Sequence, residues 1–566
     1  MAVVDASRRG YLEQVVEAAY LHTRPNCYFV GPYASRVSFK SQQIRVLDLI
    51  EGLIQTKRLR EGDRVAVVGA GLAGITAAAA LRGQDCIVDI FEGGEGIFHR
   101  QKEASHRLVH PTISRWPEER LRHTTDYGFA DWYAAPASQI YAEILSDWET
   151  RIVPSSTTPK RKLNLVKSAV TKLSPQKPDG PVRLVTVPKN DHAYRCAIIT
   201  TGFAEERVVA GLASHSYWQP KDQFSQWTEE ELKELRASDK CVLISGCGDG
   251  GLIDCLRFVH GDFRNGWLAI EIAEMCQDTV AGIIIKAERD ALMAIRSIRS
   301  TISDELPRDA NSATRTPEQN DRFVEYLKAH IEHHEYVGAL EAAYSEAVKR
   351  MPKAARLLLD KSIAKAGVNV GSVLLVAMEA RPFIPLSAPI HKLMLRHALG
   401  KGVVEFESGM LRCTEIGVPL LTQVSSSKPF PNHPYIIRHG ASANLGGLKI
   451  SNDEQRGLHI RQLLLADYID TQAPHTLKPP SGYPRLEPER QAYVSIRHSL
   501  AMKLIKSIMP GYSVRTSADG LGFEVYPLWD AEVARSKKEG YQLEMPGEMF
   551  GIRTEPSTQA TGSLWV

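Results

Sequence analysis

The stretch that decides the fold of this chain is Arg64-Val-Ala-Val-Val-Gly-Ala-Gly-Leu-Ala-Gly-Ile-Thr-Ala-Ala-Ala-Ala-Leu81. Its short apolar run at 65–68 is typical of a buried parallel strand, and the alanine-rich segment after the glycines is typical of a helix. Between the two, Gly69, Gly71 and Gly74 are spaced as G-x-G-x-x-G. The order of strand, glycine turn and helix predicts the first half of a β-α-β unit.

Each glycine has a separate physical role in such a unit. Gly69 allows the tight turn, Gly71 lets the backbone approach a diphosphate, and Gly74 lets the helix pack closely on the strand. The diphosphate would lie at the helix N-terminus, where free N–H groups and the helix dipole favour an anion. A second strand at 86–91 ends at Glu92, a carboxylate placed to accept hydrogen bonds from a ribose. We therefore expect a dinucleotide site; the alternative is a tightly packed turn that holds no ligand.

Length and composition exclude several classes of protein. A chain of 566 residues is too long for one ordinary domain and predicts two to four. Its 43% hydrophobic and 24% charged residues are typical of a soluble globular protein. A net charge of +3 is small for this length and gives no electrostatic reason to expect nucleic acid or a membrane surface as a partner. No apolar run approaches the roughly 20 residues that cross a bilayer.

The eight cysteines are scattered and form no C-x-x-C pair. This spacing predicts reduced thiols, with neither a disulfide framework nor a zinc site. The first residues lack the continuous apolar segment of a signal peptide. We expect a cytoplasmic protein without a bound metal.

Around the first glycine motif, the pattern predicts several further elements. Residues 42–57 form an amphipathic helix, so we expect 1–60 to be a helical segment that packs on the first domain and precedes its first strand. A loop rich in Gly, His, Arg and Pro at 93–117 can fold over the far end of a ligand. A helix is expected at 137–150, and antiparallel strands at 163–173 and 182–187. A buried strand at 194–202 ends in Thr200-Thr201-Gly202.

A second motif of the same spacing stands in Cys241-Val-Leu-Ile-Ser-Gly-Cys-Gly-Asp-Gly-Gly-Leu-Ile-Asp254, where Gly246, Gly248 and Gly251 repeat G-x-G-x-x-G. Helical patterns then dominate 260–367, including 322–339 and 340–358, and the next buried strand comes only at 372–379. The simplest interpretation is one nucleotide-binding unit split by a helical insertion of about 100 residues, far longer than an ordinary crossover. The alternative is a purely structural glycine turn.

The pattern of the C-terminal part predicts a segment that returns to the first domain and a small added domain after it. A strand at 435–440 and a helix near 453–468 are expected to return to the first domain, and the proline-rich stretch 474–488 is typical of a linker. A helix at 491–509 and strands near 512–515 and 522–526 indicate a small α+β domain. The last ten or so residues are rich in Ser, Thr, Gln and Gly and are expected to fray.

This order of elements resembles the flavoproteins with two dinucleotide-binding domains, in which FAD lies on the first unit and NAD(P)H on the second. In that group a strand ending in Ala-Thr-Gly joins the domains beside FAD, and Thr200-Thr201-Gly202 is similar. More narrowly, Ser41-Gln-Gln-Ile-Arg45, Arg107-Leu-Val-His-Pro111 with Trp116-Pro117, and Arg438-His-Gly440 look like a group of poorly characterised bacterial FAD/NAD(P)-binding proteins. The resemblance implies an α/β fold with two Rossmann-like domains. The FAD domain would comprise 61–235 and 426–480, the NAD(P) domain 236–425 with its insertion, and the appendage 481–566.

The resemblance also implies site residues by motif. The FAD diphosphate would meet the first glycine turn, Glu92 would meet the ribose, Val170 would touch the adenine through its backbone, and the Thr-Thr-Gly strand would lie beside the flavin. The second glycine turn would face the nicotinamide dinucleotide. In full, the implied cofactor-binding residues are Gly69, Ala70, Gly71, Ala73, Gly74, Glu92, Val170, Thr201, Gly202, Gly246, Gly248, Asp249, Gly250 and Gly251.

Two departures from the family pattern bear on the resemblance, and a further pair of residues bears on the choice of nucleotide. No C-x-x-C or C-x-x-x-x-C pair follows either glycine motif, which disfavours the disulfide reductases. The Gly-Asp pair that closes the flavin site in that group is not evident, and Arg438-His-Gly440 is expected in its place. Glu379 would favour the free 2′-hydroxyl of NADH, whereas Arg381 would pair with the 2′-phosphate of NADPH, so the choice of nucleotide stays open.

Other candidates come from the 93–117 loop and from isolated clusters. Trp116 is a candidate for stacking on the flavin, and His110 for donating to it or moving a proton near neutral pH; the alternative is a Trp-Pro corner that packs the domain, with His110 bonded to backbone. Arg107 is a candidate for the FAD phosphates, against an ion pair at the surface. Asp254 is ordinary in a first helical turn. The histidines at 330, 333 and 334 are more typical of a polar helix face than of a metal site.

Three functions are compatible with these patterns. The first is an FAD-dependent NAD(P)H oxidoreductase that passes hydride from nicotinamide to flavin and on to an acceptor or O₂; monooxygenase, oxidase and reductase remain open. The second is a regulatory or effector protein that senses or consumes the nucleotide and contacts protein partners or further copies of itself through its insertion and C-terminal domain. The third is an amine or amino-acid oxidase that holds FAD alone. The substrate, whether a small molecule or a protein, is not indicated.

Overall fold

The computed structural model describes most of the chain up to residue 440 and isolated parts beyond it. The described residues are 2–31, 37–125, 127, 129–153, 163–173, 180–186, 192–202, 206–213, 215–219, 227–238, 240–263, 266–291, 293, 335–378, 381–384, 387–415, 418–423, 427–431, 433–440, 448, 458, 462, 477, 512–516, 522–527, 551–553 and 562–565.

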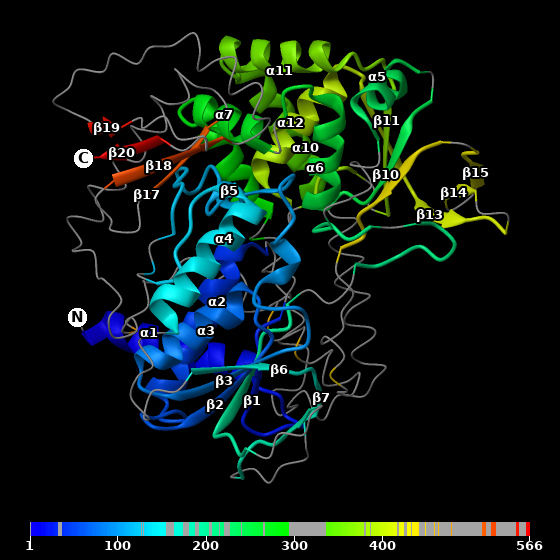
Figure 1. Cartoon of the computed structure of the whole chain (residues 1–566). Helices are drawn as coiled ribbons and strands as arrows, with labels where there is room; N and C mark the ends of the chain where they lie inside the picture. The colour runs from blue at the N-terminus through cyan, green and yellow to red at the C-terminus, as the bar shows by residue number, and fades with distance from the viewer. Residues whose placement is uncertain are drawn as a thin grey trace.

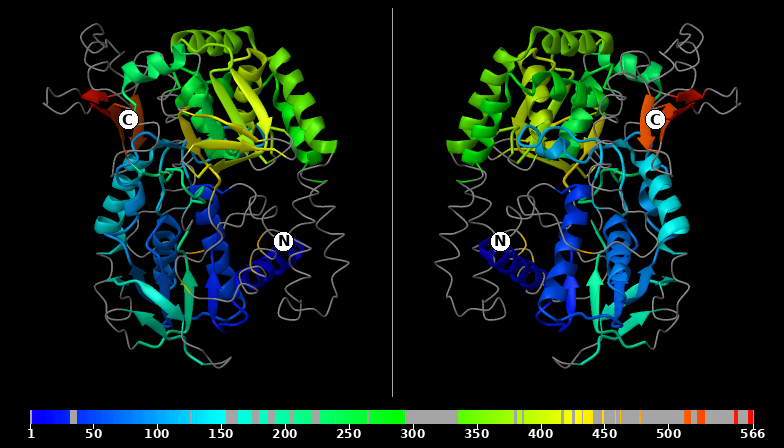
Figure 2. Two further views of the ribbon diagram at one scale, coloured as in Figure 1. Left: turned by 90° about the vertical axis from the view of Figure 1, so that its right-hand side faces the viewer. Right: turned by 90° about the vertical axis from the view of Figure 1, so that its left-hand side faces the viewer.

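Two α/β units lie one above the other, each built on a parallel sheet (Figure 1). In the first unit, the segment between β3 (Ile87–Glu92) and α4 (Ala137–Asp147) rises from one unit toward the other, as the turned views show (Figure 2). A separate antiparallel sheet near the C-terminus lies beside the second unit. The α/β fold with two Rossmann-like units is therefore confirmed. No helix in the described part of the chain is long and apolar enough to cross a membrane.

The first unit is a five-stranded parallel sheet in the order β1 (Cys27–Phe29), β9 (Cys196–Ile199), β2 (Arg64–Val68), β3 (Ile87–Glu92) and β6 (Leu163–Lys167). One face packs on helices α1 (Ala2–Ala19), α2 (Phe39–Gln55), α3 (Leu72–Gly83) and α4 (Ala137–Asp147). The other face packs on the hairpin of β7 (Val170–Leu173) and β8 (Leu184–Thr186). The strand, helix and second strand predicted around the first glycine motif are all present.

Two expectations for this unit are wrong. Residues 1–60 do not precede the first strand, because β1 lies within them and pairs with β9 at the sheet edge; three residues are too few for a strand pattern to stand out. The run at 163–173 is two strands, since β6 joins the main sheet in parallel while β7 pairs with β8 in antiparallel fashion.

The second unit is a four-stranded parallel sheet in the order β12 (Val404–Ser408), β11 (Val373–Ala377), β10 (Val242–Ser245) and β16 (Tyr435–Ile437). Helix α6 (Asp249–Val259) follows β10, and α12 (Pro389–Gly400) packs against α6. Because β11 is the direct neighbour of β10, the unit is one Rossmann-like fold split by a helical insertion.

The insertion contains α7 (Trp267–Cys276), α10 (Glu335–Arg350) and α11 (Lys353–Ala366) among its described residues. The helix predicted at 340–358 is interrupted, because Pro352 lacks the N–H that would continue α10 and instead caps α11. The described part of the predicted 322–339 helix belongs to the start of α10, and the remainder lies outside the described residues. The predicted 491–509 helix also lies outside them.

The chain returns to the first unit later than residue 426, the position expected from the sequence. Strand β16 belongs to the second sheet, and β15 (Ser427–Pro429) joins an antiparallel meander with β13 (Met410–Cys413) and β14 (Pro419–Thr422). An apolar strand pattern indicates burial but not which sheet receives the strand. The chain has returned by Gln462, whose amide donates to the Phe29 carbonyl at 2.7 Å and accepts from Arg45.

The C-terminal sheet consists of β17 (Tyr512–Thr516), β18 (Gly522–Pro527), β19 (Gly551–Arg553) and β20 (Gly562–Trp565). The two predicted strands are present. The expectation of a frayed tail is wrong for β20, which pairs with both β18 and β19.

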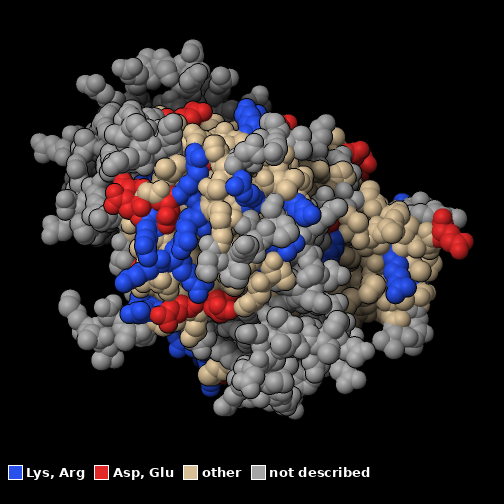
Figure 3. Space-filling view, turned by 90° about the horizontal axis from the view of Figure 1, so that it is seen from below, with Lys and Arg blue, Asp and Glu red and all other residues tan. Residues whose placement is uncertain are grey.

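The end of the first unit opposite the second is the end where β2 and β9 begin. Seen from below, the molecule shows a group of Lys and Arg side chains with fewer acidic side chains beside them (Figure 3). Arg195, just before β9, donates from Nε to the Arg58 carbonyl at 3.2 Å, and its N–H donates to the Arg64 carbonyl at 2.7 Å. These arginines are therefore neighbours at the strand starts, away from the glycine turns at the strand ends.

Candidate functional site

A cavity of about 1440 Å³ lies where the two units face each other. The carboxyl ends of β2, β3 and β9 line it from the first unit, and those of β10, β11 and β16 from the second. Ligands of open parallel sheets bind at this end of the strands. Both glycine turns therefore open into the same space.

The two glycine turns have the same construction. A Cβ on Gly74 would lie 1.9 Å from the Gly69 carbonyl oxygen, and a Cβ on Gly251 would lie 1.9 Å from that of Gly246. Helix and strand thus approach as closely as only glycine allows. The middle glycines differ, because a Cβ on Gly71 or Gly248 would meet no atom within 4 Å. The structure leaves open space at the position where a diphosphate would approach the backbone.

A neighbouring strand closes each turn in the same way. The Thr200 carbonyl after β9 would lie 2.8 Å from a Cβ on Gly69, and the Arg438 carbonyl after β16 would lie 2.1 Å from a Cβ on Gly246. Each closing segment then ends in a glycine with positive φ, +69° at Gly202 and +75° at Gly440. The expectation that Arg438-His-Gly440 closes the flavin site is therefore wrong: this segment closes the second turn.

Glu92 is fixed beside the first turn by two backbone donors. Its Oε2 accepts from the Ala70 N–H at 2.8 Å, and its Oε1 accepts from the Gly94 N–H at 2.7 Å. Each carboxylate oxygen keeps a further lone pair for a ribose hydroxyl. Val170 and Thr201 also line the cavity, and the Thr201 hydroxyl is buried with no hydrogen-bond partner among the described residues.

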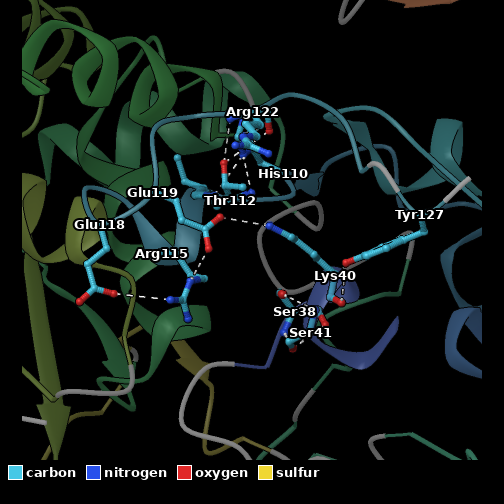
Figure 4. Close-up of polar contacts among 11 residues, drawn as sticks. Ser38, Lys40, Ser41, His110, Thr112, Arg115, Glu118, Glu119, Arg122 and Tyr127 are labelled. Atoms are coloured by element: carbon cyan, nitrogen blue, oxygen red, sulfur yellow. Dashed lines mark hydrogen bonds and ion pairs between the residues drawn. The ribbon is translucent and has the colours of Figure 1, made fainter. Parts of the chain in front are cut away.

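The loop that follows β3 is held against the start of α2 by polar contacts (Figure 4). Lys40 Nζ lies 3.1 Å from Glu119 Oε2, and Arg115 Nε donates to Glu119 Oε1 at 2.8 Å. The Tyr127 hydroxyl donates to the Lys40 carbonyl at 3.3 Å. Residues of this loop, among them Phe98, Leu108 and Ser114, line the cavity.

His110 lies on this wall, but both of its nitrogens face protein groups. The backbone N–H groups of Thr112 and Ile113 each donate to His110 Nδ1 at 3.1 Å, so the ring proton is on Nε2. Nε2 lies 3.2 Å from His123 Nδ1, and His123 Nε2 lies 3.4 Å from Glu274 Oε1. The structure shows the backbone-bonded alternative, and the role of His110 as a donor or proton carrier toward the flavin is not supported.

Two further candidates lie away from the cavity. The Trp116 side chain is fully buried in the core that α7 and α12 share, so it packs the domain and is not placed to stack on a flavin. Arg381 is half exposed and forms an ion pair with Glu341 of α10. Neither is among the cavity's lining residues. Glu379 lies outside the described residues.

Arg107 is buried, and its partner is a carboxylate rather than a phosphate. Its Nη1 donates to Asp254 Oδ1 at 2.5 Å, and its guanidinium lies 3.9 Å above the Tyr217 ring. Arg438 Nε donates to the other oxygen of Asp254 at 2.7 Å. Burial alone would raise the pKa of Asp254, but Arg107 and Arg438 outweigh it and lower the pKa. The sequence missed this cluster because its members come from distant segments with no common spacing.

A second carboxylate pair lies at the second turn. Asp249, the first residue of α6, holds His391 Nδ1 at 2.6 Å through Oδ1, which also accepts from the Ala388 N–H at 3.0 Å. These contacts overcome the effect of burial and lower the pKa of Asp249. His391 lies 142 residues after Asp249, and no pattern in the sequence singled it out.

No group of three or more metal-ligating side chains occurs in the described ranges. The histidines at 330, 333 and 334 lie outside those ranges. All eight cysteines carry free thiols, and Cys247 is the one cysteine among the described residues that line the cavity.

Comparison with known proteins finds a family model described as an NAD(P)-binding Rossmann-like domain, which matches residues 67–129. No curated protein matches the chain. Similar solved structures include an oxidised steroid monooxygenase bound to NADP (12% identity, 68% of this chain and 73% of that chain covered, TM-score 0.28). Another is bacillithiol disulfide reductase from Bacillus cereus, with 10% identity, 72% of this chain and 99% of that chain covered, and a TM-score of 0.32. A third is T. acidophilum thioredoxin reductase, with 9% identity, 72% of this chain and 98% of that chain covered, and a TM-score of 0.26. Because these TM-scores are low, the fold rests on the strand pairings above and on the match at the first glycine turn.

Proposed function

We propose that this protein is an FAD-dependent oxidoreductase that uses NAD(P)H, with FAD at the first glycine turn and the nicotinamide nucleotide at the second. The observation that carries the proposal is the single cavity lined by both turns. One space with two cradles of equal construction suits two dinucleotides held face to face. The first turn is assigned to FAD because the order of elements resembles the two-domain flavoproteins.

The residues present suit these groups. The N–H groups at the start of α3 and the open space at Gly71 suit the FAD diphosphate. Glu92 would accept from a ribose hydroxyl, and the unpartnered Thr201 hydroxyl would bond to the cofactor beside the first turn. At the second turn, α6 and Gly248 would hold the other diphosphate.

The chemistry would come from the cofactors: nicotinamide supplies a hydride and flavin accepts it, while the protein binds, orients and shields them. The described cavity wall holds one cysteine, Cys247, which is 1% exposed. A pair of thiols is needed to pass electrons through a protein disulfide, and the described wall provides no such pair. We therefore favour direct transfer from flavin to an acceptor over a dithiol relay.

The test is spectroscopic. The purified protein should show the two visible absorption bands of oxidised flavin, and anaerobic addition of NADH or NADPH should bleach them. A colourless protein that takes up no FAD would contradict the proposal. If the oxidised flavin spectrum persists in an excess of both nucleotides, a nucleotide-sensing or an FAD-only protein is favoured instead. Bleaching by an amine would identify the FAD-only protein.

A further inference from the structure

His391 lies on the cavity wall in the first turn of α12 and is 5% exposed. Its Nδ1 lies 2.6 Å from Asp249 Oδ1. Its Nε2 has no hydrogen-bond partner among the described residues, yet it is not one of the fully enclosed polar atoms. The edge of the ring that carries Nε2 is therefore the part that faces the cavity.

The position of Asp249 explains why a histidine is useful here. Asp249 is the first residue of α6, so its carboxylate lies where a diphosphate at the helix N-terminus would be repelled. His391 and the Ala388 N–H both bind Oδ1 of this carboxylate, whose side chain stays 40% exposed. Asp249 Oδ1 accepts from the Nδ1–H of His391, which fixes the orientation of the ring. When both ring nitrogens carry a proton, Nε2–H is a charged donor at the cavity.

Other nearby charges do not take this role. Lys392, the next residue on α12, is fully buried and forms an ion pair with Glu288 at 2.6 Å. Arg438 is committed to Asp254. Arg438 Nη2 has no partner among the described residues, but it is fully enclosed by protein. Of these three cationic side chains, His391 alone has an unpartnered nitrogen that is open to the cavity beside the second glycine turn.

We propose that His391 donates a hydrogen bond from Nε2 to the diphosphate of the nicotinamide dinucleotide held at the second turn, with Asp249 as the residue that fixes the orientation of the ring. This inference rests on the proposed function, because it requires a dinucleotide at that turn. It adds a contact from α12 that the glycine motif does not include.

The experiment is equilibrium binding by calorimetry to the FAD-saturated protein, so that the first site is filled. The probes are NADH, ADP, which carries the diphosphate without nicotinamide or its ribose, and AMP, which lacks the diphosphate. His391→Ala should weaken the binding of NADH and of ADP by a similar factor, about 10- to 100-fold for the loss of a charge-assisted hydrogen bond. AMP should be affected less.

Two variants keep the test interpretable. His391→Gln retains most of the size and polarity of the side chain, so it is less prone to a folding defect than His391→Ala. It should also weaken the binding of both NADH and ADP. His397→Ala is the matched control: it removes a histidine of the same helix that is also paired with a carboxylate, Asp360 at 3.1 Å, but does not line the cavity. Its affinity for the probes should equal that of the wild type.

The outcomes separate the two proposals. If the wild type binds NADH and ADP and both His391 variants bind them equally well, the His391 contact is wrong while the proposed function stands. If the variants lose NADH but keep ADP, the contact lies at the nicotinamide end and the diphosphate assignment is overturned. If the wild type binds neither probe, the proposed function fails and the contact fails with it.

Discussion

Arg107 and Asp254 form an ion pair between the two units, with Nη1 and Oδ1 2.5 Å apart and both side chains at most 1% exposed. Arg107 comes from the loop after β3, and Asp254 from α6 of the second unit. Arg438 pairs with the other oxygen of Asp254, and Glu206 lies 3.6 Å from Arg438. Two cations thus face two anions at one wall of the cavity, so the relative position of the two glycine turns depends on buried charges that must stay paired.

Removal of Arg107 should therefore destabilise the protein. Arg107→Leu leaves Asp254 buried with one cation instead of two, and breaking a buried pair typically costs about 3–5 kcal/mol. We expect a loss near the lower end, because Arg438 remains, measured as the free energy of unfolding in urea. The control is Arg120→Leu, which removes an ion pair with Asp278 whose two side chains are both more than 80% exposed. Equal effects of the two substitutions would show that the buried pair has no special role.

Two glycines of the first turn should differ in how much they contribute to the stability of the protein. Gly74→Ala places a methyl group 1.9 Å from a backbone oxygen, so it should cost about 3 kcal/mol or more of unfolding free energy. Gly71→Ala meets open space and should cost about 1 kcal/mol at most, mainly as a poorer helix cap. Urea unfolding of the FAD-free protein measures both. A loss at Gly71 as large as that at Gly74 would contradict the geometry.

His260 should make the second unit sensitive to acid. Burial, together with the neighbouring His397, lowers the pKa of His260 to about 3, and neither ring nitrogen has a partner in the described part of the chain. Unfolded histidine has a pKa near 6.5, so below about pH 6.5 the unfolded state binds a proton that the folded state does not. Stability should fall by about 1.4 kcal/mol for each pH unit below that value, and less steeply as pH approaches 3.

The substitution that tests this is His260→Phe, which keeps the ring and removes the titration. Urea unfolding between pH 7.5 and about 5 should show a flatter pH dependence than the wild type. His192→Gln, at an exposed histidine, should leave the slope unchanged. An unaltered slope in His260→Phe would mean that another group is responsible.

Much of this architecture followed from short-range patterns. The apolar run at 65–68, the glycine spacing and Glu92 are neighbours in sequence, so their arrangement follows from the local backbone. The same holds for the second turn. The split unit was also predictable, because β11 is a continuous apolar run that needed a parallel neighbour.

What the sequence did not indicate depends on contacts between distant segments. Trp116, Arg107 and Arg381 are chemically suited to a ligand, and for Trp116 and Arg107 the sequence leaves a packed corner and an ion pair open as alternatives. In the structure each contacts another element of the protein. His391 was missed for the converse reason, since its role depends on a carboxylate on another helix. The destination of β16 was also not predictable, because a buried strand fits either sheet.

The helical insertion and α12 should depend on a buried charge pair between them. Lys392 on α12 lies 2.6 Å from Glu288, which also accepts from the Tyr344 hydroxyl of α10 at 2.5 Å. Lys392→Met should cost about 3–5 kcal/mol in urea unfolding, because it leaves Glu288 buried without its cation. The double variant Lys392→Met/Glu288→Leu should recover a large part of that loss. A double variant less stable than either single one would contradict this explanation.

The central claim is that two turns of equal construction hold two different nucleotides in one cavity. Valine at either middle glycine would fill the open space while keeping an extended backbone, since φ and ψ are −69° and −178° at Gly71 and −67° and 170° at Gly248. The most direct measurement is the visible spectrum of Gly71→Val and Gly248→Val during anaerobic addition of NADH and NADPH. We expect Gly71→Val to be colourless, and Gly248→Val to be yellow, to be bleached by dithionite and not to be bleached by either nucleotide. A flavin-loaded Gly71→Val, or a Gly248→Val that bleaches as fast as the wild type, would contradict it.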